Sequence, residues 1–208
     1  MFRKSMEYMV LAAVLAALAG LSGIASAQTT NPVLVDYYTI GHGSGGFDGV
    51  LRISNFGSVA GGPAPGGDLC AMIYVFDDKE ELQECCGCLV TADDLKTLQV
   101  SSDLTDNPSN GVPLTTGPIK ILSSPRDGAG VCDPSFGGPG KALVLQGDLA
   151  AWGTHVQNGP RGRLFVTETQ AQTEPASTVD LIRISTTLCS ALLRNSSGRG
   201  RCTCGTGL

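Results

Sequence analysis

Three cysteines fall within four residues in the segment Glu84–Cys88, whose sequence is ECCGC, and a second cluster, CTCG, begins at Cys202. Cysteines at this density serve as metal ligands, as redox-active thiols or, once oxidised, as structural cross-links. The chain holds eight cysteines in all, an even number: Cys70, Cys85, Cys86, Cys88, Cys132, Cys189, Cys202 and Cys204. An even number in a secreted domain is typical of a disulfide framework.

The N-terminal residues decide in which compartment these cysteines are expected. Arg3 and Lys4 form a short positive head, Met9–Ile24 is an apolar stretch rich in Ala and Leu, and Ala25–Ala27 fits a small-x-small cleavage site. This three-part pattern predicts a secretory signal peptide over residues 1–27. The apolar stretch is short for a retained membrane anchor. We therefore expect a mature chain of residues 28–208, located in the periplasm, at the cell surface or outside the cell, with no further membrane association.

Strand geometry restricts how the cysteines can pair. Neighbouring side chains of a strand point to opposite faces, so Cys85 and Cys86 are expected to have different partners, whereas Cys86 and Cys88 share a face. A bond between Cys85 and Cys86 would need a strained ring. A hairpin after the strand that holds Cys70 is expected to bring that residue back toward Cys86 or Cys88. The rest of the connectivity stays open.

A metal or redox site is the alternative interpretation of the clusters. Cys85 and Cys88 have the C-x-x-C spacing of a zinc knuckle, but Cys202 and Cys204 form C-x-C, which is less usual. Such a site would use Cys85, Cys86, Cys88, Cys202 and Cys204. A thioredoxin-like role would need a helix after the motif, whereas Leu89–Thr91 look like the end of a strand. The sequence therefore favours structural disulfides, with no metal and no cofactor.

Composition excludes some partners and favours one fold class. The signal segment carries two basic residues and one acidic one, so the mature chain has 14 − 2 = 12 Lys+Arg and 19 − 1 = 18 Asp+Glu, a net charge of −6. This balance argues against nucleic acid or an anionic membrane surface as a partner. Glycine and proline are plentiful, which favours short strands joined by turns over a helical protein. We predict one mainly β domain, a disulfide-stapled β-sandwich with long Gly/Pro-rich loops.

Apolar patterns place most of the expected strands. Leu69–Phe76 is apolar on both faces, as in a strand buried in the middle of a sheet. Asp77–Glu81 is a charged turn, and Pro125–Gly140 is a long loop that contains Cys132. The other predicted strands lie at 33–40, 50–54, 95–102, 119–124, 141–157 and 162–170, the last two joined by a turn at 158–162.

The last segment changes from strand to helix periodicity. Ser177 is a candidate N-cap, and an apolar stripe follows at helical spacing: Leu181, Ile184, Leu188 and Leu192. We predict one C-terminal α-helix, with Cys189 beside the stripe and a tail that returns with Cys202 and Cys204. A strand over Val179–Ile184 followed by a shorter helix is the alternative.

The segment Asp68–Pro108, the sequence GPIKILSS at 117–124 and the CTCG tail together resemble a group of secreted bacterial proteins of unknown function, mainly of acidobacterial type. The resemblance spans most of the mature chain and is strongest over residues 68–124. It implies a small secreted bacterial protein, and it implies no activity that can be transferred to this chain.

Other motifs with chemical potential are weak. Gly41–Gly46 fits G-x-G-x-x-G, but the next predicted element is a strand and not the helix that a dinucleotide site requires. His42 and Ser44 are close in sequence on this glycine-rich loop, which does not hold a catalytic geometry. Asp103, Asp106, Asn107 and Asn110 are oxygen-rich, yet they lack the ligand order of an EF-hand.

Trp152 and His155 lie close together on a predicted strand, where a lone tryptophan favours core packing over a sugar platform. Three hypotheses on function follow from these observations. The first is a secreted or cell-surface structural or interaction protein, which could self-associate through edge strands such as Val33–Ile40. The second is an extracellular metal or thiol-redox protein. The third is a hydrolase that uses His42, Ser44 or His155, and we rank the three in this order.

Overall fold

The structure is a computed structural model of the chain, and it describes residues 33–41, 48–57, 67–127, 129–135, 145, 147, 149–158, 160, 163–175 and 178–205. The predicted signal peptide and the loop with His42 and Ser44 lie outside these residues.

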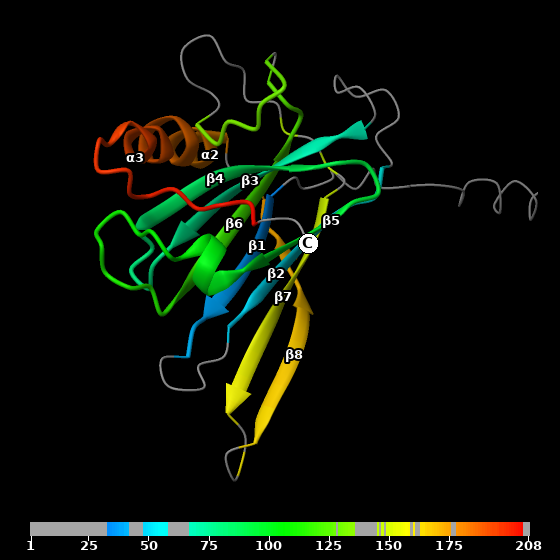
Figure 1. Cartoon of the computed structure of the whole chain (residues 1–208). Helices are drawn as coiled ribbons and strands as arrows, with labels where there is room; N and C mark the ends of the chain where they lie inside the picture. The colour runs from blue at the N-terminus through cyan, green and yellow to red at the C-terminus, as the bar shows by residue number, and fades with distance from the viewer. Residues whose placement is uncertain are drawn as a thin grey trace, which may run out of the picture.

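The described strands form two antiparallel sheets that face each other, with a helix on the outside of one of them (Figure 1). Sheet A contains, in spatial order, β4 (Leu82–Val90), β3 (Leu69–Phe76), β6 (Thr116–Ser124), β1 (Val33–Thr39) and β9 (Gln172–Thr173). Sheet B contains β5 (Leu95–Gln99), β2 (Val50–Asn55), β7 (Leu149–Asn158) and β8 (Leu164–Gln170). The prediction of a mainly β sandwich is confirmed.

The middle strand β3 is buried along its whole length, as its two-sided apolar pattern predicts. Alternate residues serve two different hydrophobic clusters, because sheet A is covered on both faces. Ala71, Ile73 and Val75 belong to the cluster between the two sheets. Met72 and Tyr74 belong to the cluster beneath the C-terminal helix. A polar substitution at any of these positions would therefore disturb a packed interior.

The C-terminal helix is continuous from residue 178 to residue 194 and has three parts: α2 (Thr178–Ile182), a π-helical segment η4 (Arg183–Cys189) and α3 (Ser190–Arg194). The predicted helix is confirmed, and the alternative strand over Val179–Ile184 is wrong. The predicted stripe packs on sheet A through Leu181, Ile184, Leu188 and Leu192. No helix in the described ranges is long and apolar enough to cross a membrane.

Side-chain hydroxyls accompany the wider π-helical turns of η4. Ser185 Oγ donates to the carbonyl of Leu181 at 2.9 Å, and Thr186 Oγ1 donates to the carbonyl of Ile182 at 2.7 Å. Hydroxyls that bond back to the preceding turn compete with the regular backbone ladder and bend helices. The apolar stripe nevertheless stays on the side that faces sheet A.

All eight cysteines lie in the described residues, and all are in disulfides: Cys70–Cys132, Cys85–Cys189, Cys86–Cys202 and Cys88–Cys204. The strand-face argument is confirmed, because Cys85 bonds to the helix on one side of β4, whereas Cys86 and Cys88 both bond to the tail.

The predicted approach of Cys70 to Cys86 or Cys88 is wrong. β3 and β4 do form the expected hairpin, but Cys70 lies opposite Leu89 and bonds to Cys132 in the following loop. Cys70 belongs to the cluster on the helix side of sheet A, whereas Cys86 and Cys88 belong to the cluster between the sheets. Residues on opposite faces of one sheet cannot bond to each other.

The C-terminal tail covers the outer edge of β4, and Figure 1 shows it in red beside this strand. The backbone N–H of Cys85 donates to the carbonyl of Gly200 at 3.0 Å, and the N–H of Thr203 donates to the carbonyl of Asp103 at 2.8 Å. Asp103 belongs to η2 (Val100–Leu104), a π-helical turn that replaces the last residues of the strand predicted over 95–102. The tail therefore joins the edges of the two sheets on this side.

Glu84 places a carboxyl group inside the protein beside this tail. It is 0% exposed, and its Oε1 accepts the N–H of Asn107 at 2.9 Å. Its Oε2 is buried and has no hydrogen-bond partner among the described residues. Burial raises the pKa of Glu84 to about 8, with the charge of nearby Asp106 adding to the rise and the Asn107 N–H opposing it. The folded protein therefore holds Glu84 protonated at neutral pH.

Replacement of Glu84 by Gln is expected to stabilise the protein more as pH rises. The Glu84 carboxyl has its ordinary pKa of 4.5 in the unfolded chain and a pKa of about 8 in the folded chain. The folded chain therefore keeps this proton while the unfolded chain loses it, and the wild-type free energy of unfolding falls as pH rises from 4.5 to about 8. Relative to wild type, Glu84→Gln should gain about 4 kcal/mol in the free energy of unfolding between about pH 5 and about pH 8.5, measured by urea unfolding. Glu81→Gln, in the exposed turn before β4, is the matched control. An equal gain for Glu84→Gln at both pH values would contradict the burial of a neutral carboxyl.

Candidate functional site

A groove of about 910 Å³ lies on the outer face of sheet A, beside the C-terminal helix. We call it the helix groove. Its floor consists of outward residues of two paired strands, among them Tyr37 of β1 and Pro118 of β6, which lie opposite each other. Leu181 and Leu188 line it from the helix, and Asp77, Asp78 and Glu80 line it from the turn between β3 and β4.

The outward face of β1 is only partly covered by the helix, which leaves part of the groove exposed. The outward residues of β1 become progressively less buried along the strand, from Val33 beneath the helix to Tyr37, which is 65% exposed. A phenol ring left in water at the floor of a groove provides a flat apolar surface with a polar tip. The helix covers only the first part of β1, so Tyr37 remains available for contact with a ligand.

Charge in the helix groove is mainly negative, because five carboxylates and two cationic side chains line it among the described residues. Lys120 and Glu174 neutralise each other through an ion pair of 2.8 Å. Asp78 and Glu80 are exposed, and no described residue donates a hydrogen bond to either carboxylate. A cationic group of a ligand could contact these carboxylates while it lies over the Tyr37 ring. The groove is therefore suited to a ligand that carries amino or guanidinium groups.

A second polar cluster lies where the chain crosses from sheet B to sheet A. The crossing follows β8, where the N–H of Ala171 still donates to the carbonyl of Ala151 of β7 at 2.9 Å. Beside it, Asp36 of β1 faces the space between the sheets and is only 6% exposed. Gly153 of β7 leaves room for this carboxylate, since a Cβ there would lie 1.8 Å from Asp36 Oδ2.

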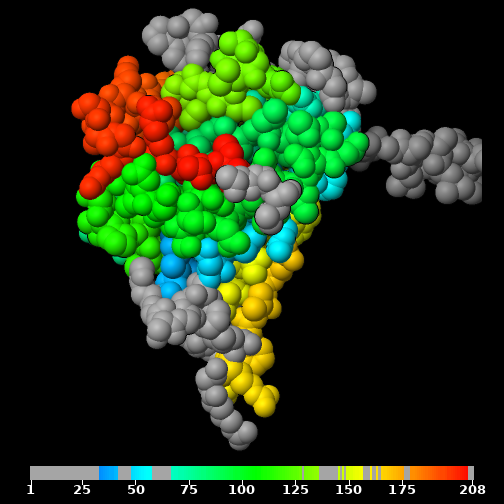
Figure 2. All heavy atoms as spheres, in the orientation of Figure 1, coloured from blue at the N-terminus to red at the C-terminus, as the bar shows by residue number. Residues whose placement is uncertain are grey.

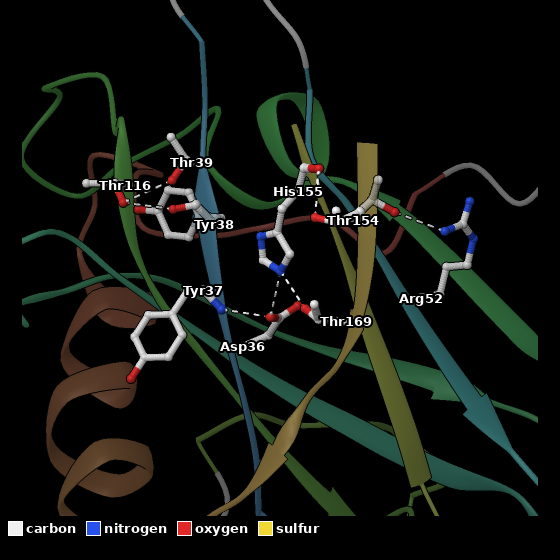
Figure 3. A network of polar contacts seen from close by, with 10 residues as sticks. Asp36, Tyr37, Tyr38, Thr39, Arg52, Thr116, Thr154, His155 and Thr169 are labelled. Carbon is white, nitrogen blue, oxygen red and sulfur yellow. Dashed lines mark hydrogen bonds and ion pairs between the residues drawn. The ribbon is translucent and has the colours of Figure 1, made fainter. Parts of the chain in front are cut away.

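His155 completes this cluster, as Figure 3 shows. Its Nε2 lies 2.8 Å from Thr169 Oγ1 and 3.5 Å from Asp36 Oδ1. Burial raises the pKa of the Asp36 carboxyl, although the N–H of Tyr37 and the nearby histidine both act in the opposite direction. The cluster joins β1 of one sheet to β7 and β8 of the other.

The geometry of this cluster does not match a nucleophile relay. In such a relay the carboxylate and the nucleophile contact different ring nitrogens of the histidine, so that one nitrogen is oriented while the other accepts the proton. Here Asp36 and Thr169 both approach Nε2 of His155. The arrangement supports a structural contact between the sheets rather than activation of Thr169.

Most of the candidate residues from the sequence have structural contacts. Asp103 Oδ2 accepts the N–H of Gln99 at 2.7 Å and holds a local turn. Asn107 Nδ2 donates to the carbonyl of Gly198 at 3.0 Å and so contacts the segment that follows the C-terminal helix. The five cysteines of the alternative metal site are bonded to other cysteines. Within the described ranges, no three His, Cys, Asp or Glu side chains are grouped as metal ligands would be.

The expected core position of Trp152 is wrong. Its neighbour Ala151 is buried between the sheets, so Trp152 points to the outer face of sheet B. It packs edge-on against Phe56, with the ring centroids 6.5 Å apart and the planes at 87°. The aromatic pair is partly exposed, because no helix covers this sheet face among the described elements.

The residues of the helix groove escaped the sequence analysis because no motif marks them. Tyr37 is one outward residue of a strand, and Asp78 and Glu80 belong to an ordinary charged turn. Glu80 has a positive φ of 62°, which is unusual for a residue other than glycine. This backbone conformation cannot be recognised from the sequence.

No protein-family model, no curated protein and no solved structure matches this chain. The resemblance to secreted bacterial proteins therefore stays a prediction.

Proposed function

We propose that this protein is a secreted or cell-surface interaction protein whose ligand-binding surface is the helix groove. One observation carries the proposal: the disulfide Cys85–Cys189 joins sheet A to the helix that forms one side of the groove. Leu188, next to the bonded Cys189, lines the groove. A covalently held side lowers the entropy lost when a ligand binds, because the surface is already ordered.

Four disulfides in one chain indicate folding in an oxidising compartment, since cytosolic thiols are kept reduced. Together with the predicted signal peptide, this supports a location in the periplasm, at the cell surface or in the extracellular medium. The negative groove adds a chemical preference. We expect its ligand to be an extended peptide or polymer that carries amino or guanidinium groups.

The two competing functions have weaker support. A metal or redox role needs thiolates, and every cysteine in this structure is bonded to another cysteine. A hydrolase that uses His155 needs a relay, and the contacts of His155 with Asp36 and Thr169 both involve one nitrogen.

The test is binding of labelled purified protein to washed surface material from the cells that produce it. Wild type should bind saturably, and Tyr37→Ala should weaken binding by about tenfold, as expected for loss of an exposed aromatic contact. Glu80→Lys should weaken binding further in low salt, because it reverses a charge at the end of the groove. Val112→Ala is the control, since Val112 is 59% exposed and does not line the groove.

Equal binding by wild type and Tyr37→Ala would reject the groove as the binding surface. Absence of saturable binding would reject the interaction function itself. A turnover that disappears in His155→Ala, while the protein stays folded, would favour the hydrolase instead.

A further inference from the structure

The sandwich closes most of its exposed strand edges. In sheet A the tail covers β4, where the N–H of Cys85 donates to the carbonyl of Gly200. At the other edge β9 has only two residues, which pair with Leu34 and Val35 of β1. Past the end of β9, the N–H of Tyr37 on β1 donates to Asp36 Oδ1 at 2.9 Å. Covered, short and capped edges prevent pairing with a strand of another molecule.

Sheet B closes one of its two edges in the same way. On β5, the N–H of Leu95 donates to Asp94 Oδ1 at 2.8 Å, and the N–H of Gln99 donates to Asp103 Oδ2 at 2.7 Å. The N–H of Val100 points toward β2 and donates to the carbonyl of Gly49. Because backbone groups alternate in direction along an antiparallel strand, the odd-numbered residues of β5 direct theirs away from β2, toward the open edge. Carboxylates thus occupy two donors of this edge.

The remaining edge, β8, has no such protection from any residue that the structure describes. Ala171 directs its N–H toward β7, so the alternation of an antiparallel pair makes Val166, Glu168 and Gln170 direct theirs away. No described residue bonds to the backbone of these three residues. In Figures 1 and 2 the yellow β7–β8 hairpin projects from the body of the molecule. Phe165 and Val166 are 52% and 65% exposed.

We propose that β8 pairs antiparallel with β8 of a second copy of this chain, so that two sheets B form one continuous sheet across a two-fold axis. A register centred on Thr167 aligns the strand Leu164–Gln170 over its whole length. In this register Val166 lies opposite Glu168 of the second copy, and both direct their backbone groups across the contact, as ladder hydrogen bonds require. Phe165 lies opposite Thr169 of the second copy.

Charge supports this occupant and this register. Glu168 is the only charged residue of the strand, and Arg52 of the same copy neutralises it through an ion pair of 2.8 Å. With Thr167 at the centre, the two Glu168 side chains are not directly opposite each other. A shift centred on Glu168 would bring like charges face to face, which destabilises a strand pair. A two-fold axis also makes the contact self-complementary, as dimer interfaces are.

Sedimentation velocity of the oxidised, mature protein tests this proposal. Wild type should dimerise with a Kd of about 1–100 µM, and more tightly at high salt, because each copy carries excess negative charge. Val166→Pro removes an outward N–H and leaves the bonds to β7 in place, so it should weaken dimerisation at least tenfold. Val166→Lys keeps the N–H but adds a charge at the edge, so it should also weaken dimerisation. It replaces the proline variant in the test if that variant fails to fold.

Tyr37→Ala is the control for the separate groove, and it should dimerise as wild type does. A wild-type protein that stays monomeric at about 500 µM in high salt would overturn the proposal. Unchanged dimerisation in Val166→Pro would also overturn it, and Val166→Lys decides in the same way if the proline variant does not fold. The edge and the groove lie on different sheets. Failure of this proposal therefore leaves the proposed interaction function open, and failure of groove binding leaves dimerisation open.

Discussion

Removing both tail disulfides should lower the free energy of unfolding by about 5 kcal/mol, whereas removing either one alone should lower it by only about 1–2 kcal/mol. The double variant replaces four residues with alanine: Cys86, Cys88, Cys202 and Cys204. Each single-bond variant replaces one bonded pair, so that no free thiol remains. The two losses are therefore expected to be strongly non-additive.

The reason is that the two bonds close almost the same loop. Both join residues 116 positions apart, and their ends are separated by only two residues on each side. With Cys85–Cys189 in place, the loop that either bond closes has an effective length of about 15 residues, for which chain entropy predicts about 3 kcal/mol. The second bond only closes a very short ring. Its loss alone leaves the tail on β4.

Loss of both bonds also releases the tail itself. Cys202 is a buried member of the cluster between the sheets, and the tail supplies the carbonyl of Gly200 to β4. Urea unfolding of the three variants and wild type gives the coupling as a double-mutant cycle. Additive losses for the two tail bonds would show that the tail is not held as one unit.

Gly117→Ala should destabilise the protein by about 3 kcal/mol or more. A Cβ at this position would lie 2.0 Å from the carbonyl oxygen of Phe76 and 3.0 Å from the carbonyl carbon of Asp77. Both are backbone atoms where β3 leaves sheet A, so no side-chain rotation relieves the overlap. The same Phe76 oxygen accepts the hydroxyl of Tyr38 at 2.8 Å, and the shift would disturb that buried bond.

Gly130→Ala is the control for this substitution. Gly130 has a positive φ of 78°, and no described atom lies within 4 Å of the position that an alanine Cβ would take, so the alanine should cost only about 1 kcal/mol of backbone strain. Thermal and urea unfolding of both variants provide the comparison. Similar small losses for Gly117→Ala and Gly130→Ala would mean that the β3 end is mobile enough to give way.

The sequence predicted the parts of the fold that depend on local pattern. Two-sided apolar residues identified β3 as a central strand, and strand alternation separated the partner of Cys85 from those of Cys86 and Cys88. Helical spacing from Leu181 onward identified the C-terminal helix. In each case the signal lies within one segment, because side-chain periodicity is fixed by the backbone.

The parts that depend on pairing between distant segments could not be predicted in this way. The two-residue strand β9 exists only because the chain crosses from one sheet to the other after Gln170. As a result β1, expected at an edge, has β6 on one side and β9 on part of the other. The outward direction of Trp152 also depends on a distant segment. The register of β7 against β2 decides which of its residues face the core, and it places Trp152 opposite Arg52.

The helix groove depends on the same long-range contacts. Tyr37, Glu80 and Leu188 come from segments that are far apart in the chain, and only the packing of the helix on sheet A brings them to one surface. The unprotected edge of β8 was equally hidden. It becomes visible only when the caps on the edges of β4, β5 and β1 are compared with it.

The cysteines of this chain are structural cross-links that hold the helix and the tail on the sandwich. The most direct test is intact mass and peptide mapping of the mature protein from its native fraction, alkylated before and after reduction. We predict no alkylation before reduction, eight alkylated cysteines after it, and the linked peptide pairs 70–132, 85–189, 86–202 and 88–204. Free thiols at Cys86, Cys88, Cys202 and Cys204, with a metal-sized excess in the native mass, would contradict a structural role for these cysteines.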